Sequence, residues 1–185
     1  SHDNGSQEGE WSAAGRLLRR MGLRPRKGLG QHFLVSPGVL EHIADAADIG
    51  PKGTVVEIGP GLGALTEVLA SRASRLVALE LDEELADALK HIFADQPHVG
   101  IMRGDATKTD INELVPESKE YKLVANLPYY IATAIIRRFL EASHKPKIIV
   151  VTLQKEVALS MAAPEGKTGL LGVATQFYGK PKIVG

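Results

Sequence analysis

The chain has 185 residues, of which 44% are hydrophobic, and its 22 acidic and 22 basic side chains give a formal net charge of zero. This length suits one globular domain with its own core, and the balanced charge argues against a uniformly basic nucleic-acid binder. The absence of cysteine excludes disulfides and thiolate metal sites and favours the cytoplasm, and no apolar run reaches the length of a membrane span, so we expect no membrane partner.

Residues 1–27 are predicted to form a flexible basic N-terminal segment. The stretch from Ser1 to about Glu10 is polar and contains glycine, and no signal-peptide core follows. Between residues 16 and 27 there are six basic residues and no acidic one: Arg16, Arg19, Arg20, Arg24, Arg26 and Lys27. Such a run can hold phosphates electrostatically, but a solvated tail or a basic helix face accounts for it equally well.

From residue 36 onward the chain alternates helical and strand patterns. Ser36 and Pro37 fit an N-cap and first helical position, and the helix they begin is predicted to end near Gly50. The later elements follow in order: strand 55–58, helix 64–72, strand 76–80, a helix capped by Asp82, strand 99–103, strand 121–125, a helix around 135–140, and strand 148–153. The fifth strand is continuously β-branched and aliphatic, which predicts burial on both faces. Alternating strands and helices predict an α/β fold with a doubly wound, mainly parallel, Rossmann-like sheet.

The stretch around which this pattern is organised is a glycine-rich turn after the first strand. Glu57 lies in that strand, and Gly59, Gly61 and Gly63 follow at alternate positions before a helix begins. Glycines permit positive φ values and leave room for a ligand against the backbone, and a helix N-terminus offers N–H groups. The turn therefore indicates a nucleotide-like ligand, although a strand reversing into a helix explains it about as well when it is taken alone.

A polar side chain stands at the carboxyl end of each predicted strand. These residues are separated by 23, 25, 21 and 28 positions: Glu57, Glu80, Asp105, Asn126 and Gln154. In a doubly wound sheet these ends share one edge, where ligands bind. We interpret Glu80 as the acceptor of a ribose diol and Asp105 as the acceptor of a nucleobase amine. A solvated strand end and a self-satisfied turn are the structural alternatives.

The stretch Asn126-Leu127-Pro128-Tyr129 distinguishes between adenosine-containing cofactors. Its amide oxygen and backbone carbonyls can accept hydrogen bonds from an exocyclic amine, and its aromatic ring can stack on a planar base. Hydride transfer to or from NAD does not need this combination, whereas transfer of a methyl group to a base amine does. The alternative is an ordinary strand-to-helix turn.

Six motifs in order resemble the KsgA family of small-subunit ribosomal RNA adenine dimethyltransferases. They span roughly 28–185 and are 31–34, 56–63, 79–82, 104–106, 126–129 and 153–157. The resemblance implies the class I methyltransferase fold and S-adenosylmethionine as cofactor. The cofactor-binding residues it implies are Gln31, His32, Leu34, Glu57, Gly59, Gly61, Gly63, Glu80, Leu81, Asp105, Ala106 and Asn126. The residues that it implies receive the target adenine are Asn126, Leu127, Pro128 and Tyr129.

By this resemblance the expected reaction is dimethylation of adenine N6 in small-subunit ribosomal RNA during ribosome biogenesis. The expected partner is that RNA or a pre-assembled small ribosomal subunit, bound by a cytoplasmic monomer. Residues 28–185 are expected to form the cofactor domain, with the family's C-terminal helical RNA-binding domain absent, and Tyr130 departs from the smaller polar residue expected there. Three alternatives stay open: a large-subunit rRNA methyltransferase of the erythromycin-resistance type, an RNA-binding assembly or transcription factor that keeps this fold, and an NAD-dependent oxidoreductase.

Overall fold

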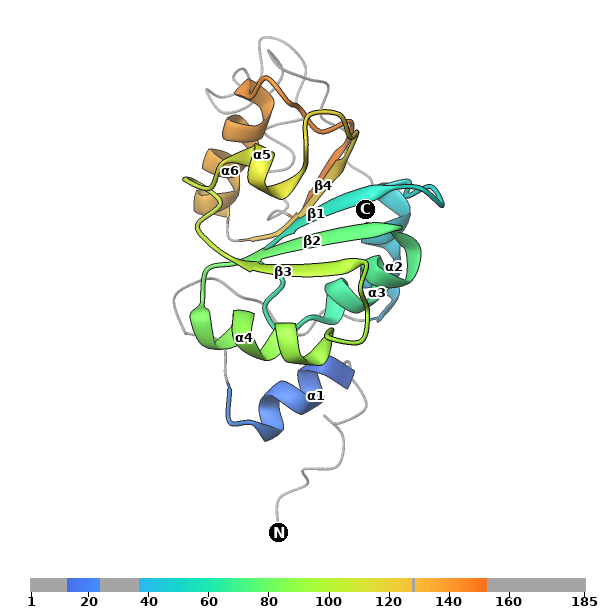
Figure 1. Cartoon of the computed structure of the whole chain (residues 1–185), viewed down its shortest axis with the longest axis vertical. Coiled ribbons are helices and arrows are strands. Elements are labelled where there is room, and N and C mark those ends of the chain that lie inside the picture. The colour runs from blue at the N-terminus through green and yellow to red at the C-terminus, as the bar shows by residue number, and fades with distance from the viewer. Residues whose placement is uncertain (1–12, 24–36, 128, 153–185) are drawn as a thin grey trace.

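The computed structural model describes residues 13–23, 37–127 and 129–152, and these form an α/β layered structure (Figure 1). Five parallel strands pair in the order β3-β2-β1-β4-β5. The strands are β1 (Thr54–Ile58), β2 (Arg75–Glu80), β3 (Val99–Arg103), β4 (Lys122–Asn126) and β5 (Ile149–Thr152). The helices are α1 (Ala13–Arg20), α2 (Pro37–Ala46), α3 (Ala64–Arg72), α4 (Glu83–Ile92), α5 (Ile111–Leu114) and α6 (Tyr129–Glu141).

Helices cover both faces of the sheet, and this explains the near-continuous apolar strands. Successive side chains of a strand point to opposite faces. Val55 packs in a core shared with α2, α3 and α4, whereas its neighbour Val56 packs in a second core with α5 and α6. Figure 1 shows the same separation, with α2, α3 and α4 on one side of the sheet and α5 and α6 on the other.

The sheet has its topological switch point between β1 and β4. From β1 the chain proceeds outward to β2 and β3, then returns to β4 on the other side and continues to β5. The chain therefore leaves β1 and β4 in opposite directions, and in sheets of this kind ligands bind outside the carboxyl ends of two such strands. The glycine turn follows β1 and Asn126 ends β4, so both predicted motifs lie at this point.

Four local features differ from the sequence-based expectations. Helix α1 lies in the N-terminal segment, where no helix was predicted, and the flexibility expected of residues 1–27 stays a prediction. Helix α2 ends at Ala46 rather than near Gly50, because Asp48 adopts a left-handed conformation with φ 48°. The prediction that strand 5 is buried on both faces is wrong: β5 is half-buried and is the outermost strand of the described sheet. The short helix α5 had no counterpart in the predicted elements.

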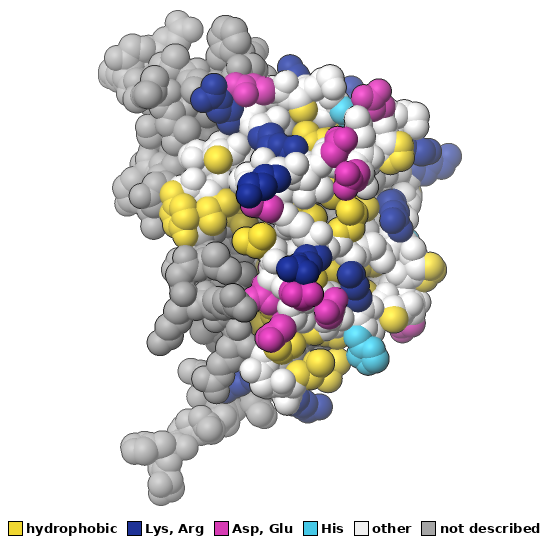
Figure 2. Space-filling model, turned by 60° about the vertical axis from the view of Figure 1, so that its left-hand side comes forward, with side chains coloured by type: hydrophobic (Ala, Val, Ile, Leu, Met, Phe, Trp, Pro, Cys, Tyr) yellow, Lys and Arg dark blue, Asp and Glu magenta, His cyan; other side chains and the backbone are white. Residues whose placement is uncertain are grey.

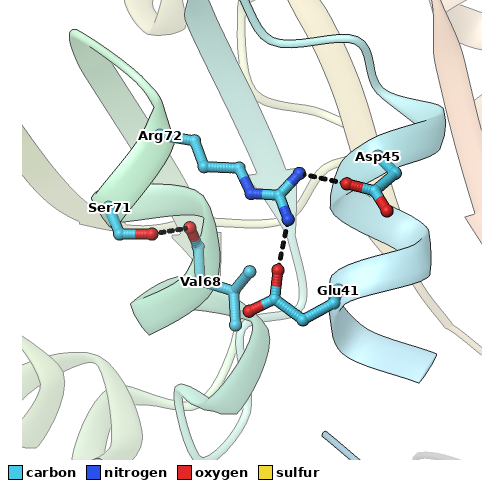
Figure 3. Close-up of polar contacts among 5 residues, drawn as sticks. All are labelled: Glu41, Asp45, Val68, Ser71 and Arg72. Atoms are coloured by element: carbon cyan, nitrogen blue, oxygen red, sulfur yellow. Dashed lines mark hydrogen bonds and ion pairs between the residues drawn. The ribbon is translucent and has the colours of Figure 1, made fainter. Parts of the chain in front are cut away.

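Helix α2 is fastened to α3 by one arginine (Figure 3). The Arg72 guanidinium donates to Asp45 Oδ1 at 2.6 Å and also to a carboxylate oxygen of Glu41, so one cation bridges two acids on successive turns of α2. These groups are partly exposed, and such pairs contribute about 1 kcal/mol or less each. They link α2 to the last turn of α3. Within the described ranges, no helix combines the length and apolarity needed to cross a bilayer.

Candidate functional site

The glycine turn between β1 and α3 has the backbone conformation that the sequence predicted. Gly59, Gly61 and Gly63 have φ values of 73°, 56° and 81°, which lie in the region that residues with a side chain rarely adopt. At Gly59 there is also no room: an added Cβ would lie 2.7 Å from Leu127 Cδ2. The turn after β1 and the turn after β4 are therefore in direct contact.

Glu80 connects the end of β2 to this glycine turn. Gly61 N–H donates to Glu80 Oε2 at 3.0 Å, and Asp82 N–H donates to Glu80 Oε1 at 3.0 Å. The residue is only 2% exposed, and this burial raises its carboxyl pKa, whereas hydrogen bonds from the backbone N–H groups of Asp82, Gly61 and Leu81 act in the opposite direction. A carboxylate has about four lone-pair sites, so these backbone bonds leave capacity for a ribose hydroxyl. The structure brings Glu80 to the turn, as the ribose interpretation required.

Glu57 lies behind the turn and is fully enclosed. Its Oε2 accepts a hydrogen bond from the Thr66 hydroxyl at 2.7 Å, which joins β1 to the first turn of α3. Burial raises the pKa of Glu57 to about 8, the Thr66 bond opposes this shift, and the nearby Glu80 charge adds to it. Glu57 is therefore mainly a neutral acid at neutral pH. Its described hydrogen bond is internal, and direct contact with a cofactor stays a prediction.

Glu57→Gln is expected to remove part of the pH dependence of folding. The pKa of Glu57 is about 8 in the folded protein and close to the ordinary 4.5 in the unfolded chain. Between these values the folded state keeps a proton that the unfolded state releases, so wild-type stability falls as pH rises through this window and stays lower above it. Glutamine has no proton to lose and still accepts from Thr66.

The measurement is urea unfolding of both proteins at about pH 5, near the lower end of the window, and at about pH 9, above its upper end. The variant should gain at least about 1.4 kcal/mol relative to wild type between the two pH values, the equivalent of one pKa unit. Glu84→Gln, an exposed site on α4, is the matched control and should follow wild type. Parallel pH profiles for wild type and Glu57→Gln would contradict the prediction.

Asp105, after β3, adopts the self-satisfied turn that was the alternative to its predicted role. Its Oδ1 accepts from the Thr107 backbone N–H at 2.9 Å and from the Thr107 hydroxyl at 2.6 Å. These bonds lower its pKa, with smaller contributions from the Lys108 and Arg138 charges. The carboxylate is thus held charged, and within the described residues no hydrogen bond reaches Oδ2. A base amine can still be accepted there, so the ligand role stays a prediction.

The loop that carries Asp105 is tied to α6. Arg138, on that helix, donates from Nη1 to the Ala106 carbonyl at 3.1 Å. Its charge also acts on Asp105. Arg138 therefore holds the backbone of the predicted cofactor loop. Ala106 is buried, whereas Leu81 is 53% exposed beside the end of β2.

Asn126 is the last residue of β4, half-buried beside the glycine turn. It pairs in register with Thr152 of β5, and the Thr152 hydroxyl donates to Asn126 Oδ1 at 2.5 Å. Leu127 follows and contacts Gly59 from the other side of the switch point. The structure therefore brings together the glycine turn, Glu80 and Asn126, which are far apart in sequence.

Several predicted site residues lie outside what the structure describes. Gln31, His32, Leu34, Pro128 and Gln154 fall in the ranges not described, and nothing is described of the side chain of Tyr129. Three structural partners were missed in the sequence: Thr66, Thr152 and the link from Arg138 to Ala106. Hydroxyl groups in a helix turn and at a strand end give no pattern of their own, so only the fold identifies their partners.

Two solved structures resemble the chain closely enough to confirm the predicted fold. The crystal structure of the 23S rRNA methyltransferase ErmE matches with a TM-score of 0.66 and 29% identity over 77% of this chain and 56% of that one. A dimethyladenosine transferase from Plasmodium falciparum also gives 0.66, with 27% identity over 78% of this chain and 52% of that one. With the all-parallel sheet order, these matches confirm the predicted α/β class I methyltransferase fold.

Curated relatives match this sequence over most of its length. A protein named ribosomal RNA small subunit methyltransferase A from Dehalococcoides mccartyi (strain CBDB1) is 52% identical over 88% of this chain, and one of the same name from Alkaliphilus metalliredigens is 42% identical over 91%. The chain spans 56% and 60% of the length of these relatives. The sequence profile described as "Ribosomal RNA adenine dimethylase" matches residues 22–184. The chain therefore belongs to the ribosomal RNA adenine dimethylase family.

Proposed function

We propose that the protein uses S-adenosylmethionine to dimethylate N6 of adenine in small-subunit ribosomal RNA, as a cytoplasmic monomer acting in ribosome biogenesis. The observation that carries the proposal is the contact between the two turns. Gly59 of the predicted cofactor turn and Leu127 of the predicted adenine turn are so close that no side chain fits between them. A methyl donor on the first turn and an acceptor amine on the second would be neighbours, as direct transfer requires.

The described residues fit an adenosine-containing cofactor. Three positive-φ glycines expose the backbone, and the Glu80 carboxylate is fixed beside them with acceptor capacity left for a ribose hydroxyl. On the neighbouring loop, Asp105 is held in its charged form, and a base amine can donate a hydrogen bond to its Oδ2. Bound S-adenosylmethionine would supply a methyl group made electrophilic by a positively charged sulfur. Gln31, His32 and Leu34 are proposed to complete the site.

The second turn is proposed to orient the target amine. The lone pair of an adenine amino nitrogen is delocalised into the ring, so the nitrogen is a poor nucleophile. Asn126 Oδ1 and the Leu127 carbonyl can accept its two N–H bonds, which favours a pyramidal nitrogen with its lone pair directed at the methyl group. Tyr129 is proposed to stack on the ring. We assign no general base, because the nitrogen proton becomes acidic once the new C–N bond forms and water accepts it.

The partner is proposed to be an RNA in which the target adenine is unpaired or flipped out, since a stacked base could not enter this site. Figure 2 shows acidic and basic side chains interspersed on one face, so the described part of that face has no single strong charge. The exposed residues Arg16, Arg19 and Arg20 on α1 offer a more concentrated positive charge for phosphates. RNA recognition is therefore assigned to α1 and the basic residues after it.

The names of the curated relatives favour small-subunit RNA, whereas one structural neighbour, ErmE, is named as a 23S rRNA methyltransferase. A fold of this kind could also serve RNA binding without catalysis. The sharpest test exposes the full-length protein, with S-adenosylmethionine labelled in its methyl group, to small and large ribosomal subunits from cells lacking these modifications. Digestion and mass spectrometry then identify the methylated nucleoside.

We expect dimethyladenosine in the small-subunit RNA alone. Label in the large-subunit RNA alone would replace the proposal with the large-subunit activity, and RNA binding without label would replace it with an assembly role. Calorimetric titration with S-adenosylmethionine, with NAD in parallel, tests the cofactor separately: binding of NAD alone would overturn the assignment.

A further inference from the structure

Among the residues that the structure describes, Thr152 is the hydrogen-bond partner of the Asn126 side chain. The two residues face each other in the β4–β5 register, each at the carboxyl end of its strand, and Thr152 Oγ1 donates to Asn126 Oδ1 at 2.5 Å. Both side chains are half-buried. The hydroxyl thus reaches the oxygen that the proposed mechanism uses, on the edge of the sheet where the site lies.

The fold itself does not require a hydroxyl at this position. Strands β4 and β5 are held by their backbone ladder, and the residues before Thr152 in β5 are Ile149, Val150 and Val151. Valine has nearly the shape of threonine and suits a strand at least as well. Packing alone therefore leaves the choice of threonine unexplained, and its one described polar contact is with Asn126.

A free asparagine amide has a broad terminal torsion, and its oxygen and nitrogen offer opposite hydrogen-bonding chemistry. A bond from a fixed strand residue restrains this torsion. The oxygen has two lone pairs, so the bond from Thr152 occupies one and leaves the other for an amine N–H. If the Asn126 amide is restrained before the substrate binds, less conformational freedom is lost on the way to the transition state. Small misplacements of reacting groups lower the reaction rate strongly.

We propose that Thr152 is a positioning residue for methyl transfer, whose hydroxyl holds the Asn126 amide in the orientation that accepts the adenine amine. The proposal rests on the proposed function and adds to it a residue on β5 that touches neither the methyl group nor the target nitrogen. It predicts a defect in kcat rather than in cofactor affinity or RNA affinity, because Thr152 acts through Asn126 after both ligands are bound.

The test compares Thr152→Val, which removes the hydroxyl and keeps the shape, with Thr152→Ser, which keeps the hydroxyl. Thr54→Val is the matched control, because Thr54 begins β1 at the opposite edge of the sheet. Methylation of small-subunit RNA by the full-length protein is measured at a temperature where thermal melting shows every variant folded. We expect Thr152→Val to lower kcat about 10- to 100-fold with KM for RNA and S-adenosylmethionine affinity little changed. Thr152→Ser should recover most of the loss, and Thr54→Val should behave as wild type.

A double-mutant cycle establishes whether Thr152 acts through Asn126. In an Asn126→Ala background, the valine substitution should have little further effect on residual transfer, because the group it positions is gone. A Thr152→Val enzyme with wild-type kcat would overturn the proposal, and so would an undiminished valine effect in the Asn126→Ala background. If the wild-type protein methylates neither RNA, the proposed function fails, and that result differs from an active wild type with an unaffected Thr152→Val variant.

Discussion

Asn126→Ala is expected to lower kcat for RNA methylation by about 100- to 1,000-fold, the range found when one preorganised hydrogen-bonding group is removed from an active site. Asn126 ends β4 at the switch point, its amide is already held by Thr152, and Leu127 beside it contacts the glycine turn. Alanine removes an acceptor for the target amine and leaves the backbone carbonyl of Leu127. The loss should therefore fall mainly on the chemical step, which single-turnover transfer from labelled S-adenosylmethionine measures directly.

Asn112→Ala provides the matched control, because Asn112 is an exposed residue of α5 whose amide reaches only Glu117 among the described bonds. It should retain wild-type turnover. A calorimetric titration shows whether Asn126→Ala still binds S-adenosylmethionine, which separates a loss of chemistry from a loss of cofactor. An Asn126→Ala enzyme with an unchanged rate would refute the assignment of Asn126 as the residue that grips the amine.

Glu80→Gln is expected to weaken S-adenosylmethionine binding by about 10- to 100-fold. Both carboxylate oxygens accept from backbone N–H groups, Oε2 from Gly61 and Oε1 from Asp82. An amide has one acceptor oxygen, so its NH₂ group must face one of these donors. Hydrogen bonds to a charged group are worth about 1.5–3 kcal/mol each, and losing one here displaces either the glycine turn or the start of α4. Isothermal titration calorimetry measures the change.

Glu84→Gln is the control, because Glu84 is exposed in the first turn of α4, and this variant should bind S-adenosylmethionine as wild type does. The pH dependence gives a second readout. Burial raises the pKa of Glu80, so wild-type affinity should fall, as the solution is acidified, at a higher pH than an ordinary glutamate would show. Glu80→Gln should lack that contribution. Equal affinities for wild type and variant would exclude Glu80 from the cofactor site.

Much of the fold could be predicted because its signals are local. The strand from Thr54 to Ile58, the glycine turn and the helix from Ala64 to Arg72 lie where apolar runs and glycines indicated. The Asp82 cap of α4 formed as expected, with its side chain accepting from Leu85 N–H at 3.1 Å. Because alternating strands and helices wind in one hand, this order of elements also predicted a parallel sheet with its polar strand ends on one edge.

The misjudged features depend on context beyond a few neighbouring residues. The β-branched and aliphatic run 148–153 predicted a doubly buried fifth strand, but burial depends on which strands and helices lie beside it, and β5 is outermost in the described sheet. No helix was predicted in the basic N-terminal segment, yet residues 13–20 form α1, which packs near α3 and α4. A helix of only eight residues gains most of its stability from the surface it packs against, which local composition does not report.

The sequence alone determined which chemical groups stand at the sheet edge: three glycines, Glu80, Asp105 and Asn126, each tied to a strand end by short-range patterns. Only the tertiary structure decided which of them touch. It placed Leu127 against Gly59, gave both oxygens of Glu80 backbone partners, turned Asp105 onto Thr107 and paired Thr152 with Asn126. The physical reason is range: torsional preferences and hydrophobic periodicity act over a few residues, whereas a hydrogen bond between residues 126 and 152 needs a strand order and register that the whole sheet fixes.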